Sequence, residues 1–87
     1  MTAAVDTQKE QLLRSFILEN YLFTDDQSAL NNGDSFLENG ILDSMGILEV
    51  IHYLDEEFSI KVADEEMVPE NLDSINNLLA FIAKKLG

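Results

Sequence analysis

Residues 43–58 read "DSMGILEVIHYLDEEF", and this stretch decides the fold. Its apolar side chains recur every three or four residues, as on one face of an α-helix. Asp43 stands just before that pattern, where an aspartate side chain can cap a helix by accepting a backbone hydrogen bond. The stretch therefore predicts a helix over residues 44–58 with Asp43 as its N-cap. The apolar face of this helix consists of Ile47, Val50, Ile51, Leu54 and Phe58.

A second helical pattern precedes this stretch and is separated from it by a long segment of turn formers. The pattern predicts a first helix over residues 7–21, opened by Thr7 and Glu10 at the spacing of a capping box. Residues 23–43 lack sustained periodicity and are expected to form a loop, with a turn of helix near residues 26–30. Four apolar residues are expected to hold this loop on the core: Phe36, Leu37, Ile41 and Leu42.

The C-terminal third contains one short and one long helical pattern. A short helical turn is expected near residues 64–67, ended by Pro69 because the residue before a proline avoids the helical region. Asp73 or Ser74 can cap the last helix. The predicted fold class is all-α, with three main helices and one short helix around a single core and a long loop between the first and second helices. The apolar stripe of the last helix consists of Ile75, Leu78, Leu79, Ile82 and Leu86.

Composition limits the classes of protein that the sequence can represent. A chain of 87 residues has room for one domain, residues 1–87, of which residues 1–6 are expected to be a flexible N-terminus. No cysteine is present, so disulfides and thiolate metal sites are excluded. The N-terminal segment lacks the pattern of a signal peptide, and no apolar run approaches the roughly 18 residues of a membrane helix. We expect a soluble intracellular protein without membrane insertion.

Charge is the strongest compositional feature of the chain. It has 17 acidic and 5 basic residues, which give a formal net charge of -12. Nucleic acid and anionic lipid are poor partners for such a surface, because binding either one requires lysine or arginine. The negative electrostatic field of such a surface attracts proteins with basic surfaces. The alternative is that the charge serves only solubility.

Ser44 opens the predicted second helix and could be a cap, a nucleophile or an attachment point. A nucleophilic serine needs a base within hydrogen-bond reach. The single histidine, His52, lies eight residues further along the same helix, which is about 12 Å at the helical rise per residue. Self-contained hydrolytic catalysis is therefore not expected.

The other chemical interpretations of this region can be weighed in the same way. The acidic and amide residues between Asp25 and Asp34 lack the spacing of a calcium-binding loop, so no dedicated metal site is expected. Capping alone explains most Asp-Ser pairs at a helix start, but Asp43 already supplies the cap here. An attachment point is then the better interpretation of Ser44, and a helix N-terminus tolerates a phosphate on that hydroxyl.

Two segments resemble a known family. Residues 38–58, "ENGILDSMGILEVIHYLDEEF", resemble the modification site of acyl carrier proteins, where Asp-Ser-Leu or Asp-Ser-Met opens a long acidic helix. Residues 67–82, "MVPENLDSINNLLAFI", resemble the junction of the third and fourth helices of that family. The resemblance extends over about residues 10–86 and implies a four-helix bundle of acyl-carrier type. It further implies that a phosphopantetheinyl transferase attaches 4'-phosphopantetheine from coenzyme A to Ser44, and that Asp43 helps the transferase to recognise the site.

The outward face of the second helix is expected to dock partner enzymes. Exposed apolar side chains among acids suit a surface that meets a basic partner. In terms of the resemblance, two positions depart from the common pattern: Gly46 stands where many carriers have an acid, and His52 where many have a methionine. Both departures put the ordinary partners of fatty acid synthesis in doubt. The expected docking residues are Met45, Leu48, Glu49, Asp55 and Glu56.

These observations lead to one main functional hypothesis and two alternatives. The main hypothesis is a cytoplasmic, monomeric acyl carrier protein, which is a carrier and not an enzyme. It would present thioester-bound acyl groups to enzymes of fatty acid, lipid or polyketide-type biosynthesis. Its partners would be the transferase with coenzyme A, a loading ligase or transferase, and acyl-processing enzymes with basic surfaces. The first alternative is a D-alanyl or aminoacyl carrier loaded by an adenylating ligase, since the "DSMG" variant is similar to such carriers. The second is an acidic helical adaptor without a prosthetic group.

Overall fold

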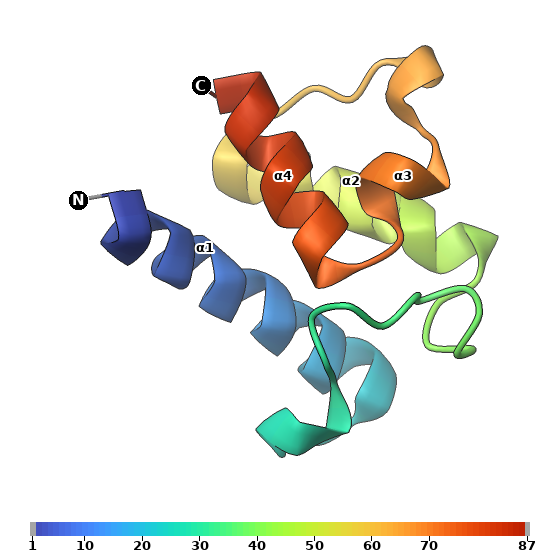
Figure 1. Ribbon diagram of the computed structural model, residues 1–87. Coiled ribbons are helices and arrows are strands. Elements are labelled where there is room, and N and C mark those ends of the chain that lie inside the picture. The colour runs from blue at the N-terminus through green and yellow to red at the C-terminus, as the bar shows by residue number, and fades with distance from the viewer. Residues whose placement is uncertain (1, 87) are drawn as a thin grey trace.

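The computed structural model describes the backbone of residues 2–86 and the side chains of residues 8–86. Within that range it is all-helical, so the predicted fold class is confirmed. Helix α4 packs against α1 and α3, and a long loop connects the end of α1, at the bottom of Figure 1, to the start of α2, at the right. The elements are α1 (Thr2–Ile17), the π-helical turn η1 (Leu18–Leu22), the 3₁₀ turn η2 (Gln27–Ala29), α2 (Ser44–Phe58), the 3₁₀ turn η3 (Asp64–Glu66), α3 (Pro69–Leu72) and α4 (Ile75–Leu86).

The first helix begins earlier than the sequence predicts. Its backbone is helical from Thr2, so Thr7 lies inside α1 and the prediction that Thr7 and Glu10 open the helix is wrong. The preceding residues include two alanines, the strongest helix former, which accounts for the longer helix. The flexibility of residues 1–6 stays a prediction. At the other end, η1 stops at Phe23, whose φ of 55° places it in the left-handed region.

The core draws on all four α-helices, on η1 and on the long loop. Phe36 and Leu42 bring the long loop into it, and Ile41 packs against it. Leu37 does not, because 43% of its surface remains exposed, so this part of the prediction is wrong. In α4, Leu86 is likewise exposed. The buried apolar residues are Leu13, Ile17, Leu18, Leu30, Phe36, Leu42, Val50, Leu54, Ile60, Leu72, Ile75, Leu78, Phe81 and Ile82.

The segment before α4 differs from the prediction at one residue. The expected short turn is present as η3, but Pro69 begins the short helix α3 instead of only ending the turn. Proline is favoured at the first helical position, where its missing N–H has no partner to lose. Ser74 caps α4, since its hydroxyl oxygen accepts the Asn77 N–H at 3.1 Å. Asp73 faces the long loop instead.

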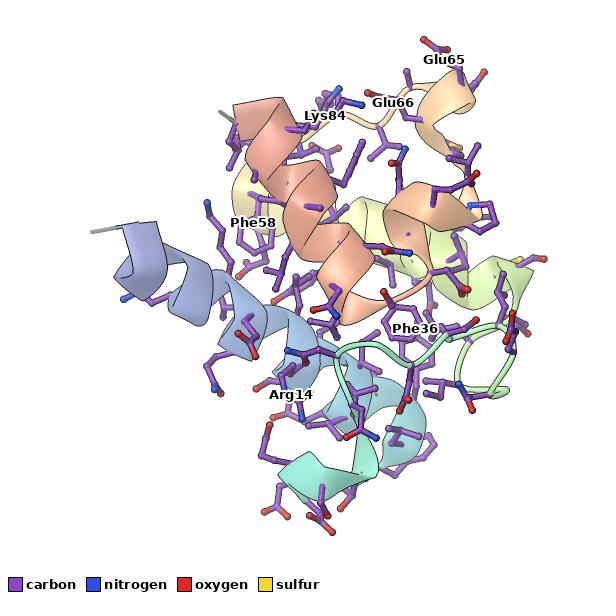
Figure 2. The ribbon with its side chains drawn as sticks, viewed as in Figure 1. Arg14, Phe36, Phe58, Glu65, Glu66 and Lys84 are labelled. Atoms are coloured by element: carbon purple, nitrogen blue, oxygen red, sulfur yellow. The ribbon has the colours of Figure 1, made fainter. Side chains whose placement is uncertain are left out.

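Arg14 fastens the start of the long loop to α1. Its side chain is only 8% exposed, and Figure 2 shows it where α1 meets the loop. The guanidinium donates to the side-chain oxygen of Gln27 at 3.0 Å, to the Gln27 carbonyl at 2.7 Å and to the side-chain oxygen of Asn32 at 2.6 Å. These three hydrogen bonds hold the start of the loop against α1, although the loop has little regular structure of its own.

Candidate cofactor-attachment site

Ser44 is the first residue of α2 and is exposed. Asp43, with φ of -109° and ψ of -169°, is the N-cap that the sequence predicts, and its carboxylate accepts the Gly46 N–H at 2.9 Å. Asp43 also accepts the Ile47 N–H at its carbonyl, at 3.0 Å. Since Asp43 makes the capping hydrogen bonds, the Ser44 hydroxyl is not needed for capping and stays accessible at the helix start.

The surroundings of Ser44 contain no machinery for hydrolysis. His52 lies two turns along α2 with an exposed side chain, and it pairs with Glu56 at 3.4 Å. The described side chains also contain no group of three or more histidines and carboxylates that could hold a metal ion. Among residues 2–86, no helix has both the length and the apolar character of a membrane span. What the structure places at this position is an exposed serine hydroxyl at the start of α2.

Two cavities open beside Ser44. The first, of about 320 Å³, lies between α2 and the α3 segment and is largely apolar. The second, of about 610 Å³, lies between the loop and the end of the first helical segment. Ser44 and Leu37 line both, so exposed Leu37 stands between them. The first cavity is lined by Leu37, Ser44, Ile47, Leu48, Ile51, Met67, Val68, Pro69, Leu72 and Asp73, and the second by Tyr21, Leu37, Gly40, Ile41, Leu42, Asp43 and Ser44.

Four of the five expected docking residues are exposed on the solvent side of α2, and the fifth, Asp55, is only partly exposed. Met45 and Leu48 are 67% and 52% exposed, and Glu49 and Glu56 are exposed as well. Asp55 is half-buried, and the Lys61 ammonium lies 2.9 Å from its carboxylate. Part of its charge is thus neutralised by a neighbour from its own chain.

Tyr21 belongs to this region, although in the sequence it is only the last residue of the first predicted helix, residues 7–21. Its hydroxyl donates a hydrogen bond to Glu49. Burial of the ring, that hydrogen bond and the charges of Glu49 and Asp43 raise the pKa of Tyr21 to about 12. A contact between positions 28 residues apart leaves no signal in a local pattern, which is why the sequence did not reveal it.

Gly46 has a packing role that the sequence does not show. It is buried in the first turn of α2, and a Cβ atom at this position would lie 3.0 Å from Cδ2 and 3.2 Å from Cβ of Leu42. Leu42 thus packs directly against the helix backbone. The departure at Gly46 from the common carrier pattern serves close packing of the loop, and Gly46 is not part of the exposed face.

Comparisons with known proteins agree with this geometry. The family described as "Phosphopantetheine attachment site" matches residues 21–82. The acyl carrier protein of Buchnera aphidicola subsp. Acyrthosiphon pisum (strain Tuc7) is 36% identical over 59 residues, which are 68% of this chain and 71% of that protein. The D-alanyl carrier protein of Streptococcus uberis is 33% identical over 73 residues, which are 84% of this chain and 87% of that protein. The chain belongs to the family of phosphopantetheine-bearing carrier proteins, which carry substrates and are not themselves catalysts.

Proposed function

We propose that Ser44 is the residue that carries the phosphopantetheine arm. The observation that carries this proposal is an exposed hydroxyl at the start of α2, beside an N-cap already supplied by Asp43. Three of the five other serines have hydroxyls that are engaged in hydrogen bonds. Ser28 donates to Asp26, Ser35 donates to Asp73, and Ser74 is buried and caps α4.

The arm would hold acyl groups as thioesters for enzymes of fatty acid, lipid or polyketide-type biosynthesis. The cofactor supplies the thiol that forms the thioester, because the chain has no cysteine. Eight of the ten residues that line the cavity of about 320 Å³ beside Ser44 are apolar, which favours an acyl cargo with a hydrocarbon chain. The one carboxylate in the lining, that of Asp73, already accepts hydrogen bonds from Ser35 and Leu37. The exposed side of α2 would dock partner enzymes through Met45, Leu48, Glu49 and Glu56, with a smaller electrostatic contribution from Asp55.

A D-alanyl carrier loaded by an adenylating ligase is the second candidate function. It is favoured by the similarity to the Streptococcus uberis carrier, which extends over most of both chains. Incubating the phosphopantetheine-bearing protein with D-alanine, ATP and a D-alanine-activating ligase, and separately with a fatty acid and an acyl-activating ligase, distinguishes the two cargoes by the thioester formed. The adaptor without a prosthetic group is not retained, because the chain has a phosphopantetheine attachment domain. The cytoplasmic location and the monomeric state stay predictions.

Fluorescent labelling tests the role of Ser44. The full chain is incubated with a fluorescent coenzyme A analogue and a broad-specificity phosphopantetheinyl transferase, and the labelled band is measured on a gel. Wild type and Ser59→Gly are expected to be labelled equally, and Ser44→Ala not at all. Ser59 is the matched control because it is an exposed serine at the other end of α2, and glycine tolerates its φ of 57°. Equal labelling of Ser44→Ala would overturn the proposal.

A further inference from the structure

The corner between α3 and α4 contains a carboxylate that the proposed function does not use. Asp73 follows α3, and its N–H closes that helix by donating to the carbonyl oxygen of Pro69 at 3.0 Å. It does not cap α4, because Ser74 does. The carboxylate of Asp73 is therefore available to a different part of the chain.

That part is the segment of the long loop that leads toward Ser44. The Leu37 N–H donates to Oδ1 of Asp73 at 3.0 Å, and the Ser35 hydroxyl donates to Oδ2. The Phe36 N–H donates to the Asp73 carbonyl oxygen at 2.8 Å. Three acceptor atoms of one residue thus bind donors from three consecutive residues that are 36 to 38 positions away in the sequence. The side chain of Phe36 is fully buried, and Figure 2 shows it between the loop and α4.

The hydrogen bonds continue from this anchor to the start of α2. The Phe36 carbonyl oxygen accepts the N–H groups of Ile41 and Leu42 at 2.8 and 3.2 Å, which closes the turn. The Leu42 side chain then packs under Gly46 in the first turn of α2. A continuous set of contacts therefore links Asp73 to the turn that presents Ser44.

We propose that Asp73 is a positioning residue for cofactor attachment. By fixing residues 35–37, it holds the loop that places the Ser44 hydroxyl for the transferase. The inference rests on the proposed role of Ser44. In that reaction, the serine oxygen forms a bond to the phosphorus next to the pantetheine of coenzyme A. The bond from this phosphorus to adenosine 3',5'-bisphosphate breaks, and the serine proton passes to a base of the transferase.

The role of Asp73 predicts a specific kinetic change. Asp73→Ala removes both side-chain hydrogen bonds, so the Ser44 oxygen is held less well during attack. The docking face on the outer side of α2 is left intact. We expect kcat of phosphopantetheine transfer to fall about tenfold, with KM for the carrier changed less than about twofold. Rates are measured with coenzyme A and a broad-specificity transferase, and are expressed per folded molecule from the circular dichroism melting curve of each variant.

Three further variants separate positioning from general destabilisation. Asp73→Asn keeps an oxygen for the Leu37 N–H and is expected to recover most of kcat. Ser35→Ala removes one hydroxyl that donates to Asp73, and is expected to lower kcat. Ser28→Ala is its matched control, because the Ser28 hydroxyl also donates to an aspartate of the same loop, Asp26, and the Ser28 N–H donates to the same carboxylate. We expect Ser28→Ala to react like wild type.

Each outcome decides the inference. If Asp73→Ala reacts at the wild-type rate per folded molecule, or if only its KM changes, Asp73 is not a positioning residue. If Asp73→Ala does not fold, the comparison of Ser35→Ala with Ser28→Ala decides, and equal rates overturn the inference. The proposed function fails in a different way, since the wild-type chain itself would then not be modified at Ser44.

Discussion

Gly46 shows how a single residue can fit the loop to the functional helix. A buried glycine near a helix start lowers helix propensity, and roughly 1 kcal/mol is typical for a helix interior. Here the absence of a Cβ atom lets Leu42 approach the backbone of α2. The residue that departs from the common carrier pattern is thus explained by the packing of the loop beside Ser44.

Replacing Gly46 with a larger residue should destabilise the protein. Gly46→Val is expected to lower the free energy of unfolding by about 2 kcal/mol, because the added atoms crowd Leu42 in an already filled site. Met45→Val is the matched control, since it places valine one residue earlier in the same turn, where the side chain is exposed. Urea denaturation measures both variants. If both variants lost the same small amount of unfolding free energy, the side chain of Leu42 would be able to move away from residue 46 without destabilising the fold.

Tyr21 gives a second prediction at the scale of one residue. In a Tyr53→Phe background it is the only tyrosine, so ultraviolet absorbance reports its titration alone. We expect a pKa of about 12, which Glu49→Gln lowers toward the ordinary value of 10.0 by removing the charge that Tyr21 contacts. A midpoint near 10 with Glu49 still present would contradict the contact.

The same shift has a consequence for stability at high pH. The raised pKa means that the folded protein keeps the Tyr21 proton more tightly than the unfolded chain does. This contribution is complete below pH 10 and is lost as the pH rises from about 10 to about 12. In the Glu49→Gln variant, the free energy of unfolding should therefore fall less between pH 10 and pH 12 than it does in the wild type.

At the scale of the elements, the fold depends on side chains that fix an irregular loop to regular helices. Arg14 holds the beginning of the loop on α1, and Asp73 holds its later part on the α3–α4 corner. Between these anchors, Leu30 and Phe36 are buried. The long loop is therefore a structured part of the site and not a passive connection.

Arg14→Lys tests the first anchor. Lysine keeps the charge but has a single ammonium group, which cannot reproduce the fork of hydrogen bonds to Gln27 and Asn32. We expect the free energy of unfolding to fall by about 2 kcal/mol. The control is Lys84→Arg, which exchanges the same two residue types at an exposed position and should change stability by less than about 0.5 kcal/mol. A similar small change in both variants would contradict the role of Arg14.

The elements differ in how well the sequence predicts them, for physical reasons. The bounds of α2 agree with the prediction because its cap and its apolar face are local signals. The capping box at Thr7 is also a local signal, but the helix-forming residues before it extend α1 past it. Pro69 is compatible with either end of a helix, so its position alone could not reveal α3.

The residues of the candidate site also differ in how well the sequence predicts them. Ser44, Asp43 and the exposed side of α2 could be predicted from neighbouring residues. The contacts of Tyr21 with Glu49 and of Asp73 with the loop could not, because their partners lie 28 or more positions apart. The tight fit of Gly46 against Leu42 depends on the path of the backbone, which a residue pattern does not contain.

At the scale of the whole molecule, a net charge of -12 is confined to a small domain, whose Cα radius of gyration is 12.1 Å. Many acidic groups are therefore forced close together. Lys61 forms an ion pair with Asp55 and Lys85 forms one with Glu66, each at 2.9 Å. The remaining carboxylates outnumber the basic groups and repel one another. This repulsion favours more open states of the chain.

Salt should therefore stabilise the fold. We expect the melting temperature to rise with sodium chloride, because screening weakens the repulsion among exposed carboxylates more than it weakens the few ion pairs. A variant with Asp25→Asn, Glu38→Gln, Asp64→Asn and Glu65→Gln serves as the control, and its melting temperature should respond less. All four residues are exposed. A melting temperature that does not change with salt would contradict this account of the charge.

The central claim is that Ser44 carries the cofactor, and a site-resolved mass spectrum tests it most directly. The full chain is incubated with coenzyme A and a phosphopantetheinyl transferase, digested with a protease and fragmented in the mass spectrometer. We predict a single phosphopantetheine unit, located on Ser44 in the peptide that contains "LDSMG". A chain that gains no phosphopantetheine, or one that gains it on any other residue, would contradict the claim.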